Sequence, residues 1–406
     1  MADASLGFIT LLGGALAAGY AGHLVFRRFR VSDVSFLIAL GILAGPVLGL
    51  VDPGPLAPAI PFLSPLALVV VLFEGGLELA WEDIRAHANR ALGMGLTTWA
   101  LTGVLVGGAA WLLLGLPPAL ALLFGYAVAA TGMLVVIPLL QQVNAPTEAR
   151  VILTVETSLG DLLSAVVVTT VAGMMLAHGS PAQGLGLLAA RFTVGAAVGL
   201  LAGLAWARLL HRWRPEKHAY MVTLAALLLA YVVTQRLGGS GYLAALAFGL
   251  TLGNAPALMR LGGIDDLAPL PSASRGLQSE LIFLLRSIYF VFLGLSIPRS
   301  VLTPGFALAG LGLLAALLLA RVVGIGLAAR RSPSRGLLLA MMPRGLATAV
   351  IAAIPVAMGV PGTERFPAYC FLVILAADLA TSVGLWWVAR RAPFPAGGHD
   401  AAPLPR

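Results

Sequence analysis

Charged residues are scarce in this chain. Only 10% of its 406 residues are Asp, Glu, Lys or Arg, whereas 59% are hydrophobic, and the mean hydropathy is +0.97. A soluble globular domain carries about 25% charged residues. The deficit excludes a soluble enzyme, and the sequence predicts an all-α, polytopic membrane protein.

Cysteine and metal-ligand patterns are also lacking. The single cysteine, Cys370, excludes a disulfide within the chain. The six histidines show no spacing typical of metal ligands, and we expect no cofactor. The net charge of +8 raises the question of nucleic acid, but the basic residues are spread over short loops, so no nucleic-acid partner is expected.

Long apolar runs fill most of the sequence. A helix needs about 20 apolar residues to cross a bilayer. The first run has no basic region or cleavage site before it, so we expect a retained helix and not a removed signal peptide. About thirteen spans are predicted, roughly at 5–26, 32–50, 61–80, 91–115, 118–142, 149–178, 183–210, 217–236, 239–255, 276–297, 301–329, 334–358 and 366–389.

The basic residues test this number of spans. If the spans alternate, one set of loops holds 18 of the 25 Lys and Arg residues, the other set holds 3, and 4 lie inside spans. Such a bias follows the positive-inside rule. It predicts a multi-pass protein of the cell inner (plasma) membrane, with the N-terminus outside and the C-terminus in the cytoplasm.

One carboxylate, Asp161, lies within an apolar run that is long enough to cross the membrane. A charge at that depth costs roughly 2.5–3.5 kcal/mol, so the residue indicates an ion or proton site. Thr157, Ser158 and Ser164 lie three or four residues away and share its helix face. Such oxygens suit a monovalent cation, although a structural hydrogen-bond cluster is the alternative. Glu156 faces another direction.

Glycine and proline interrupt two of the predicted spans. Gly132 and Pro138 lie in the fifth span, and Pro343 and Gly345 flank Arg344 in the twelfth. These residues can open a transmembrane helix where other groups satisfy the freed backbone. Broken helices of this kind build midplane sites in transporters, whereas a simple kink is the alternative.

Further charges lie inside the spans. A buried arginine needs an acidic partner, and we predict that Glu156 pairs with Arg344. Arg344 could also offset the negative ends of opened half-helices. Asp378, in the last span, either pairs with Arg344 or Arg286 or is a second protonatable group. Glu74 is a candidate for the site or its entry path.

The order of these features predicts two inverted repeats of six helices. The fifth and twelfth spans are interrupted, and the sixth and thirteenth carry Asp161 and Asp378. Six spans on each side of a connecting helix have opposite topology. The predicted organisation is a first repeat at 1–178, a connecting helix 7 at 179–213, a second repeat at 214–390 and a disordered cytoplasmic tail at 391–406.

Several motifs in this order resemble the monovalent cation:proton antiporter family, specifically its sodium/proton exchanger branch, over about residues 5–390. The motifs are Gly41-Ile-Leu-Ala-Gly-Pro, Phe73-Glu-Gly-Gly-Leu-Glu-Leu, Arg286-Ser-Ile-Tyr-Phe-Val-Phe-Leu-Gly and Arg344-Gly345. The family's fifth helix usually reads Thr-Asp-Pro and its sixth Glu-Ser-x-x-Asn-Asp. Here Thr131, Glu156 and Asp161 are kept, while Gly132 and Gly160 replace the family's Asp and Asn.

The resemblance implies an exchanger of Na⁺, Li⁺ or K⁺ for protons, with Asp161 bound by the cation or the proton in turn. Thr131, Thr157 and Ser158 would supply neutral oxygens to the cation. The resemblance also implies alternating access by a moving bundle, a lipid environment and a homodimer. The alternatives are a coupled symporter of a small organic solute on a similar scaffold, and a non-transporting sensor or a gated channel.

Overall fold

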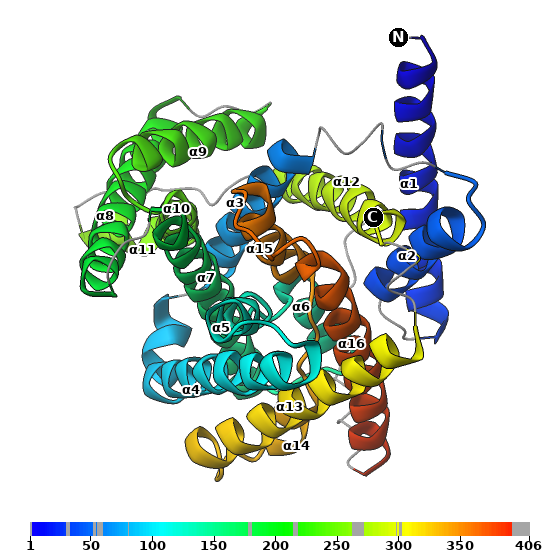
Figure 1. Cartoon of the computed structure of the whole chain (residues 1–406). Coiled ribbons are helices and arrows are strands. Elements are labelled where there is room, and N and C mark those ends of the chain that lie inside the picture. Colours follow the sequence, from blue (N-terminus) through cyan, green and yellow to red (C-terminus); the bar gives the residue numbers. More distant parts are fainter. Residues whose placement is uncertain are drawn as a thin grey trace, which may run out of the picture.

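The computed structural model describes residues 2–29, 33–51, 54, 60–79, 81–177, 181–213, 218–261, 272–297, 299 and 303–391. Every long regular element in these ranges is a helix (Figure 1). In chain order they are α1 (Ala2–Phe29), α2 (Asp33–Ile42), the π-helix η1 (Leu43–Val47), α3 (Ile60–Glu78), α4 (Trp81–Leu114), α5 (Pro118–Ala127), α6 (Met133–Gln142), α7 (Thr147–Ala177), α8 (Pro181–Trp213), α9 (Ala219–Arg236), α10 (Gly241–Gly253), α11 (Ala255–Leu261), α12 (Ser272–Leu295), α13 (Pro304–Ala328), α14 (Arg335–Ala340), α15 (Leu346–Ala357) and α16 (Phe366–Arg391).

The predicted all-α class is confirmed, and each predicted span contains a helix in the described part of the chain. Six of these helices (α4, α7, α8, α9, α13 and α16) are long and apolar enough to cross a membrane by themselves. The number of crossings stays a prediction, because several other apolar helices are shorter. The predicted tail, after Arg391, lies outside the described residues.

The helices pack in two groups. In the first, called the core group here, α4 packs against α5, α7 and α13, while α13, α14 and α15 pack against α16. In the second, called the outer group, α3, α8 and α9 pack against α10, and α1 and α2 pack against α12. The two groups meet mainly where α15 packs against α3, near the centre of Figure 1, and where α7 approaches α8 and α10.

Both predicted interruptions are present as breaks between half-helices. The chain leaves the helical path between α5 and α6, and again between α14 and α15. The two breaks cross in contact, and the backbone N–H of Gly132 donates to the carbonyl oxygen of Pro343 at 3.0 Å. A Cβ atom on Gly132 would lie 2.6 Å from the backbone nitrogen of Gly345 and 2.8 Å from its Cα atom. Glycine is therefore required at this crossing.

We expect Gly132→Ala to destabilise the protein, because its methyl group would collide with backbone atoms that have no room to move. Overpacking of this kind costs about 1–3 kcal/mol or more. The measurement is the thermal unfolding temperature of the purified protein in detergent. Gly108→Ala in α4 is the matched control, because no described atom outside its own helix backbone and chain neighbours lies within 4 Å of its Cβ position. Equal unfolding temperatures for the two variants would contradict the close crossing.

Candidate functional site

Asp161 lies in the middle of α7 with only 1% of its surface exposed. Its carboxylate receives a hydrogen bond from the backbone N–H of Thr131, in the break between α5 and α6, and it interacts electrostatically with the guanidinium of Arg344. Its Oδ1 atom has no hydrogen-bond partner among the protein atoms that the structure describes. Asp161 thus lies beside the non-helical backbone of the break, with one carboxylate oxygen that has no partner among the described protein atoms.

The three predicted neutral ligands lie around this carboxylate on α7 and at the break. Thr131 accepts a hydrogen bond from Arg344 through its Oγ1 atom at 3.1 Å. Thr157 donates to the carbonyl oxygen of Thr154 at 3.0 Å, and Ser158 donates to the sulfur of Met133 at 3.4 Å. Thr157 and Ser158 use their protons in these bonds, so their oxygen lone pairs stay available to a cation.

Arg344 holds the C-terminal end of α5. Its Nη1 atom donates to the carbonyl oxygens of Ala129 at 2.8 Å and Ala130 at 2.5 Å. Thr348 adds a second donor to the Ala130 carbonyl at 2.9 Å. Ala129 and Ala130 lie just beyond α5, which ends at Ala127, so Arg344 contacts freed backbone of the break. That Arg344 offsets the negative end of an opened half-helix stays a prediction.

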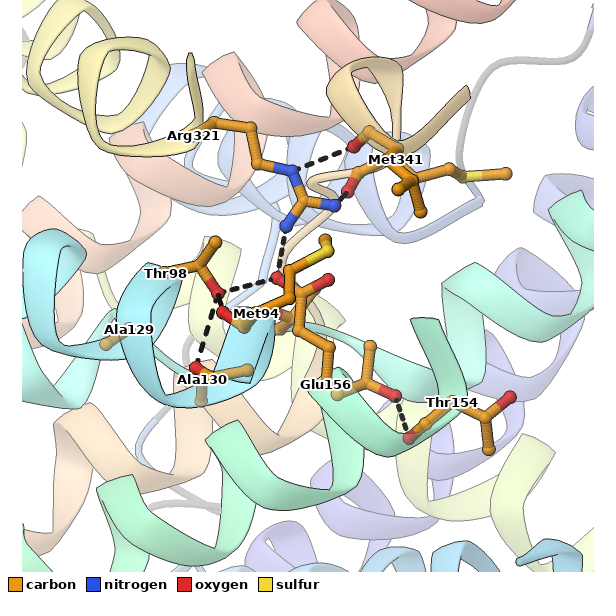
Figure 2. Close-up of polar contacts among 12 residues, drawn as sticks. Met94, Thr98, Ala129, Ala130, Thr154, Glu156, Arg321 and Met341 are labelled. Carbon is orange, nitrogen blue, oxygen red and sulfur yellow. Dashed lines mark hydrogen bonds and ion pairs between the residues drawn. The ribbon is translucent and has the colours of Figure 1, made fainter. Parts of the chain in front are cut away.

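The predicted ion pair between Glu156 and Arg344 is wrong. The carboxylate of Glu156 instead pairs with Arg321, which reaches it from α13 (Figure 2). Both side chains are buried, and Thr98 on α4 donates to the same carboxylate oxygen at 2.9 Å. Arg321 also donates to the carbonyl oxygen of Leu338 at 2.9 Å and to that of Met341. The pair therefore joins three core helices to the end of α14.

The physical reason for this error lies in the break itself. The Nη1 atom of Arg344 donates to the freed carbonyl oxygens of Ala129 and Ala130 in the break, and such backbone acceptors cannot be recognised from the charges in a sequence. Arg321 had a usable signal, because it is one of the four basic residues inside apolar spans. Choosing between Arg321 and Arg344 required knowledge of which helices are neighbours.

Asp378, with 2% of its surface exposed, lies at the other break. It accepts a hydrogen bond from the backbone N–H of Arg344 at 3.1 Å, so it contacts this residue through the main chain. The hydroxyl of Ser35 on α2 donates to it at 3.4 Å. Glu74 is buried on α3, in the electrostatic surroundings of Tyr220 on α9.

Comparisons with known proteins decide the family. A family model described as "Sodium/hydrogen exchanger, transmembrane" matches residues 12–390, which is most of the chain. The chain belongs to the sodium/hydrogen exchanger family. It is 27% identical over 393 residues to the Na⁺/H⁺ antiporter 1 of Methanocaldococcus jannaschii, covering 92% of this chain and 89% of that protein.

Two further comparisons report a more distant relative in sequence and a similar fold. It is 27% identical over 384 residues to the K⁺/H⁺ antiporter NhaP2 of Shewanella baltica, covering 90% of this chain but only 63% of that longer protein. Its fold is similar to the structure of the sodium proton antiporter MjNhaP1 from Methanocaldococcus jannaschii. The TM-score is 0.76 and the identity 23%, over 94% of this chain and 96% of that one.

The buried ion pair gives a stability prediction. Arg321→Met leaves the Glu156 carboxylate buried without its partner, which costs about 3–5 kcal/mol. We expect a lower unfolding temperature, and the double variant Arg321→Met/Glu156→Met should recover most of the loss. Arg90→Met is the control, because its pair with Glu148 is partly exposed and contributes about 0–1 kcal/mol. An Arg321→Met variant as stable as Arg90→Met would contradict the pairing.

A second prediction concerns the break between α14 and α15. Asp378→Ala removes the acceptor of the Arg344 N–H, and an unsatisfied buried group costs about 1–3 kcal/mol. Asp378→Asn keeps a side-chain oxygen that can accept this bond, so its loss should be smaller. Thermal unfolding of the two variants in one detergent measures the difference. If Asn and Ala were equally destabilising, acceptance of the amide would not be the role of Asp378.

Proposed function

We propose that the chain is a secondary active transporter that exchanges a monovalent cation, Na⁺, Li⁺ or K⁺, for protons across the membrane. The observation that carries this proposal is Asp161, a buried carboxylate at a helix break with one oxygen that has no partner among the described protein atoms. The exchanger family and its Na⁺/H⁺ and K⁺/H⁺ antiporter relatives support the same activity.

The cation and the proton compete for Asp161 in this mechanism. A proton on the carboxylate neutralises it, and a buried carboxyl group tolerates the neutral form well. A cation replaces the proton when Thr131, Thr157 and Ser158 supply neutral oxygens in place of part of its hydration shell. Binding of one ion then excludes the other, which is the condition for exchange.

Alternating access follows from the two helix groups. The core group would move against the outer group and expose Asp161 to each side of the membrane in turn. The two breaks would stay together during this movement, because hydrogen bonds join them within the core group. Gly132 donates to the carbonyl oxygen of Pro343, and Arg344 donates to that of Ala129. The Ser35–Asp378 contact joins the two groups and would change as they move.

The layout supports two inverted repeats. Thr131 and Arg344 each lie two residues before a half-helix, and each donates its backbone N–H to a carboxylate on the helix that follows, Asp161 or Asp378. We further propose about thirteen crossings, an outside N-terminus, a cytoplasmic C-terminus in the plasma membrane and a homodimer. Glu74 remains proposed as an entry-path carboxylate.

Proteoliposomes that contain a pH-sensitive dye test the exchange. After a pH gradient is imposed, we expect Na⁺, Li⁺ or K⁺ to dissipate it in the wild type, while choline does not. Asp161→Asn cannot bind a proton or offer a charge to the cation, so its response should fall to that of protein-free vesicles. Glu364→Gln is the control, because its carboxylate is exposed at a loop. Full cation-dependent dissipation by Asp161→Asn would refute the proposal.

A further inference from the structure

A small cavity lies beside the crossing, inside the core group. Glu156 and Gly160 of α7, Thr102 of α4, and Thr131 and Arg344 of the two breaks line its wall. Its volume, measured as the room for the centre of a water-sized sphere, is about 10 Å³. That is close to the smallest volume that holds one water molecule, and a buried water also needs two to four polar partners.

Gly160 accounts for the room. It lies four residues after Glu156, so both residues occupy the same face of α7. A Cβ atom at position 160 would lie 3.7 Å from the carbonyl oxygen of Ala129 and 3.9 Å from the backbone nitrogen of Thr131. These are ordinary contact distances, and a side chain at this position would enter the space that the glycine leaves open.

Two charged groups of opposite sign end at this cavity with an unsatisfied atom. Glu156 and Arg344 are each only 3% exposed. The Oε2 atom of Glu156 and the Nε atom of Arg344 have no hydrogen-bond partner among the described residues. Leaving buried atoms of charged groups without a partner is unfavourable, so the wall of the cavity offers one strong acceptor and one strong donor.

We infer that this cavity binds one water molecule, which donates a hydrogen bond to Glu156 Oε2 and accepts one from Arg344 Nε. A cation would suit the carboxylate but would be repelled by the guanidinium groups of Arg321 and Arg344, which both line the cavity. An anion would be repelled by Glu156. Water alone satisfies both groups, because it donates and accepts at the same time.

The water joins two hydrogen-bond networks that the protein atoms leave separate. One network links Arg321 and Thr98 to Glu156, and the other links Arg344 to the carbonyls at the end of α5. With the water in place, a continuous chain of bonds runs from α13 through α7 to the break that holds Asp161. The site is independent of which ion is transported.

Stability of glycine-to-alanine variants tests the water site. In a helix interior with free space, Gly→Ala is stabilising. Gly93→Ala in α4 is the matched control, because no described atom outside its own helix backbone and chain neighbours lies within 4 Å of its Cβ position. We expect Gly93→Ala to raise the unfolding temperature of the full chain in detergent. Gly160→Ala should lower it, because its methyl group expels the water and leaves Glu156 and Arg344 unsatisfied. Gly160→Ser should recover much of the loss, because its hydroxyl can take the place of the water.

Three outcomes would overturn the inference. Gly160→Ala stabilised as much as Gly93→Ala would mean that the cavity holds no bound water. Gly160→Ser as destabilised as Gly160→Ala would mean that position 160 rejects any side chain for steric reasons. An electron-density map at a resolution that shows ordered water, with no peak between Glu156 Oε2 and Arg344 Nε, would also overturn it. These measurements do not use transport, so a failed exchange assay leaves them unaffected.

Discussion

The need to satisfy open backbone inside a membrane governs this structure. Where two helices are broken, their freed N–H and C=O groups cannot bond to lipid and need partners in the protein or in enclosed water. Arg344 donates hydrogen bonds to the carbonyl oxygens that follow α5, and Thr348 is a second donor to one of them. Asp161 and Asp378 accept hydrogen bonds from backbone N–H groups at the two breaks. The charged groups of the proposed transport site are thus the same groups that hold the crossing together.

The two breaks are alike in backbone and unlike in charge. A carboxylate faces the amide of the residue two positions before each second half-helix, but that residue is Thr131 at one break and Arg344 at the other. The side chain of that residue is a neutral hydroxyl at the first break and a guanidinium at the second. We therefore propose that the same backbone geometry serves a cation-binding carboxylate, Asp161, at one break and a positioning carboxylate, Asp378, at the other.

Much of this arrangement could be predicted from the sequence, because single residues signal it. Glycine and proline within apolar runs predicted both breaks. A carboxylate in the middle of such a run singled out Asp161 as a candidate site residue. The partner of Glu156 could not be predicted in the same way. Arg321 and Arg344 both lie in apolar runs, so the sequence gives no reason to prefer either as the partner of Glu156. The packing of α13 on α4 brings Arg321 to Glu156, whereas Arg344 donates to carbonyl oxygens beyond the end of α5. The contact of Asp378 with a main-chain amide could not be predicted either, because every residue except proline has a backbone N–H and the sequence does not show which one is a donor.

The close approach of Gly132 to Gly345 limits which side chains position 132 can carry in this fold. The chain departs from the family pattern at Gly132 and at Gly160, and the two departures are not equally reversible. Position 160 has ordinary clearance for a new side chain, so a single change could restore a polar group there. Position 132 lies against the backbone of the opposite break, and an aspartate could return only if the two half-helix pairs moved apart first. A carboxylate at position 132 is therefore compatible with this fold only together with further substitutions that separate the two breaks.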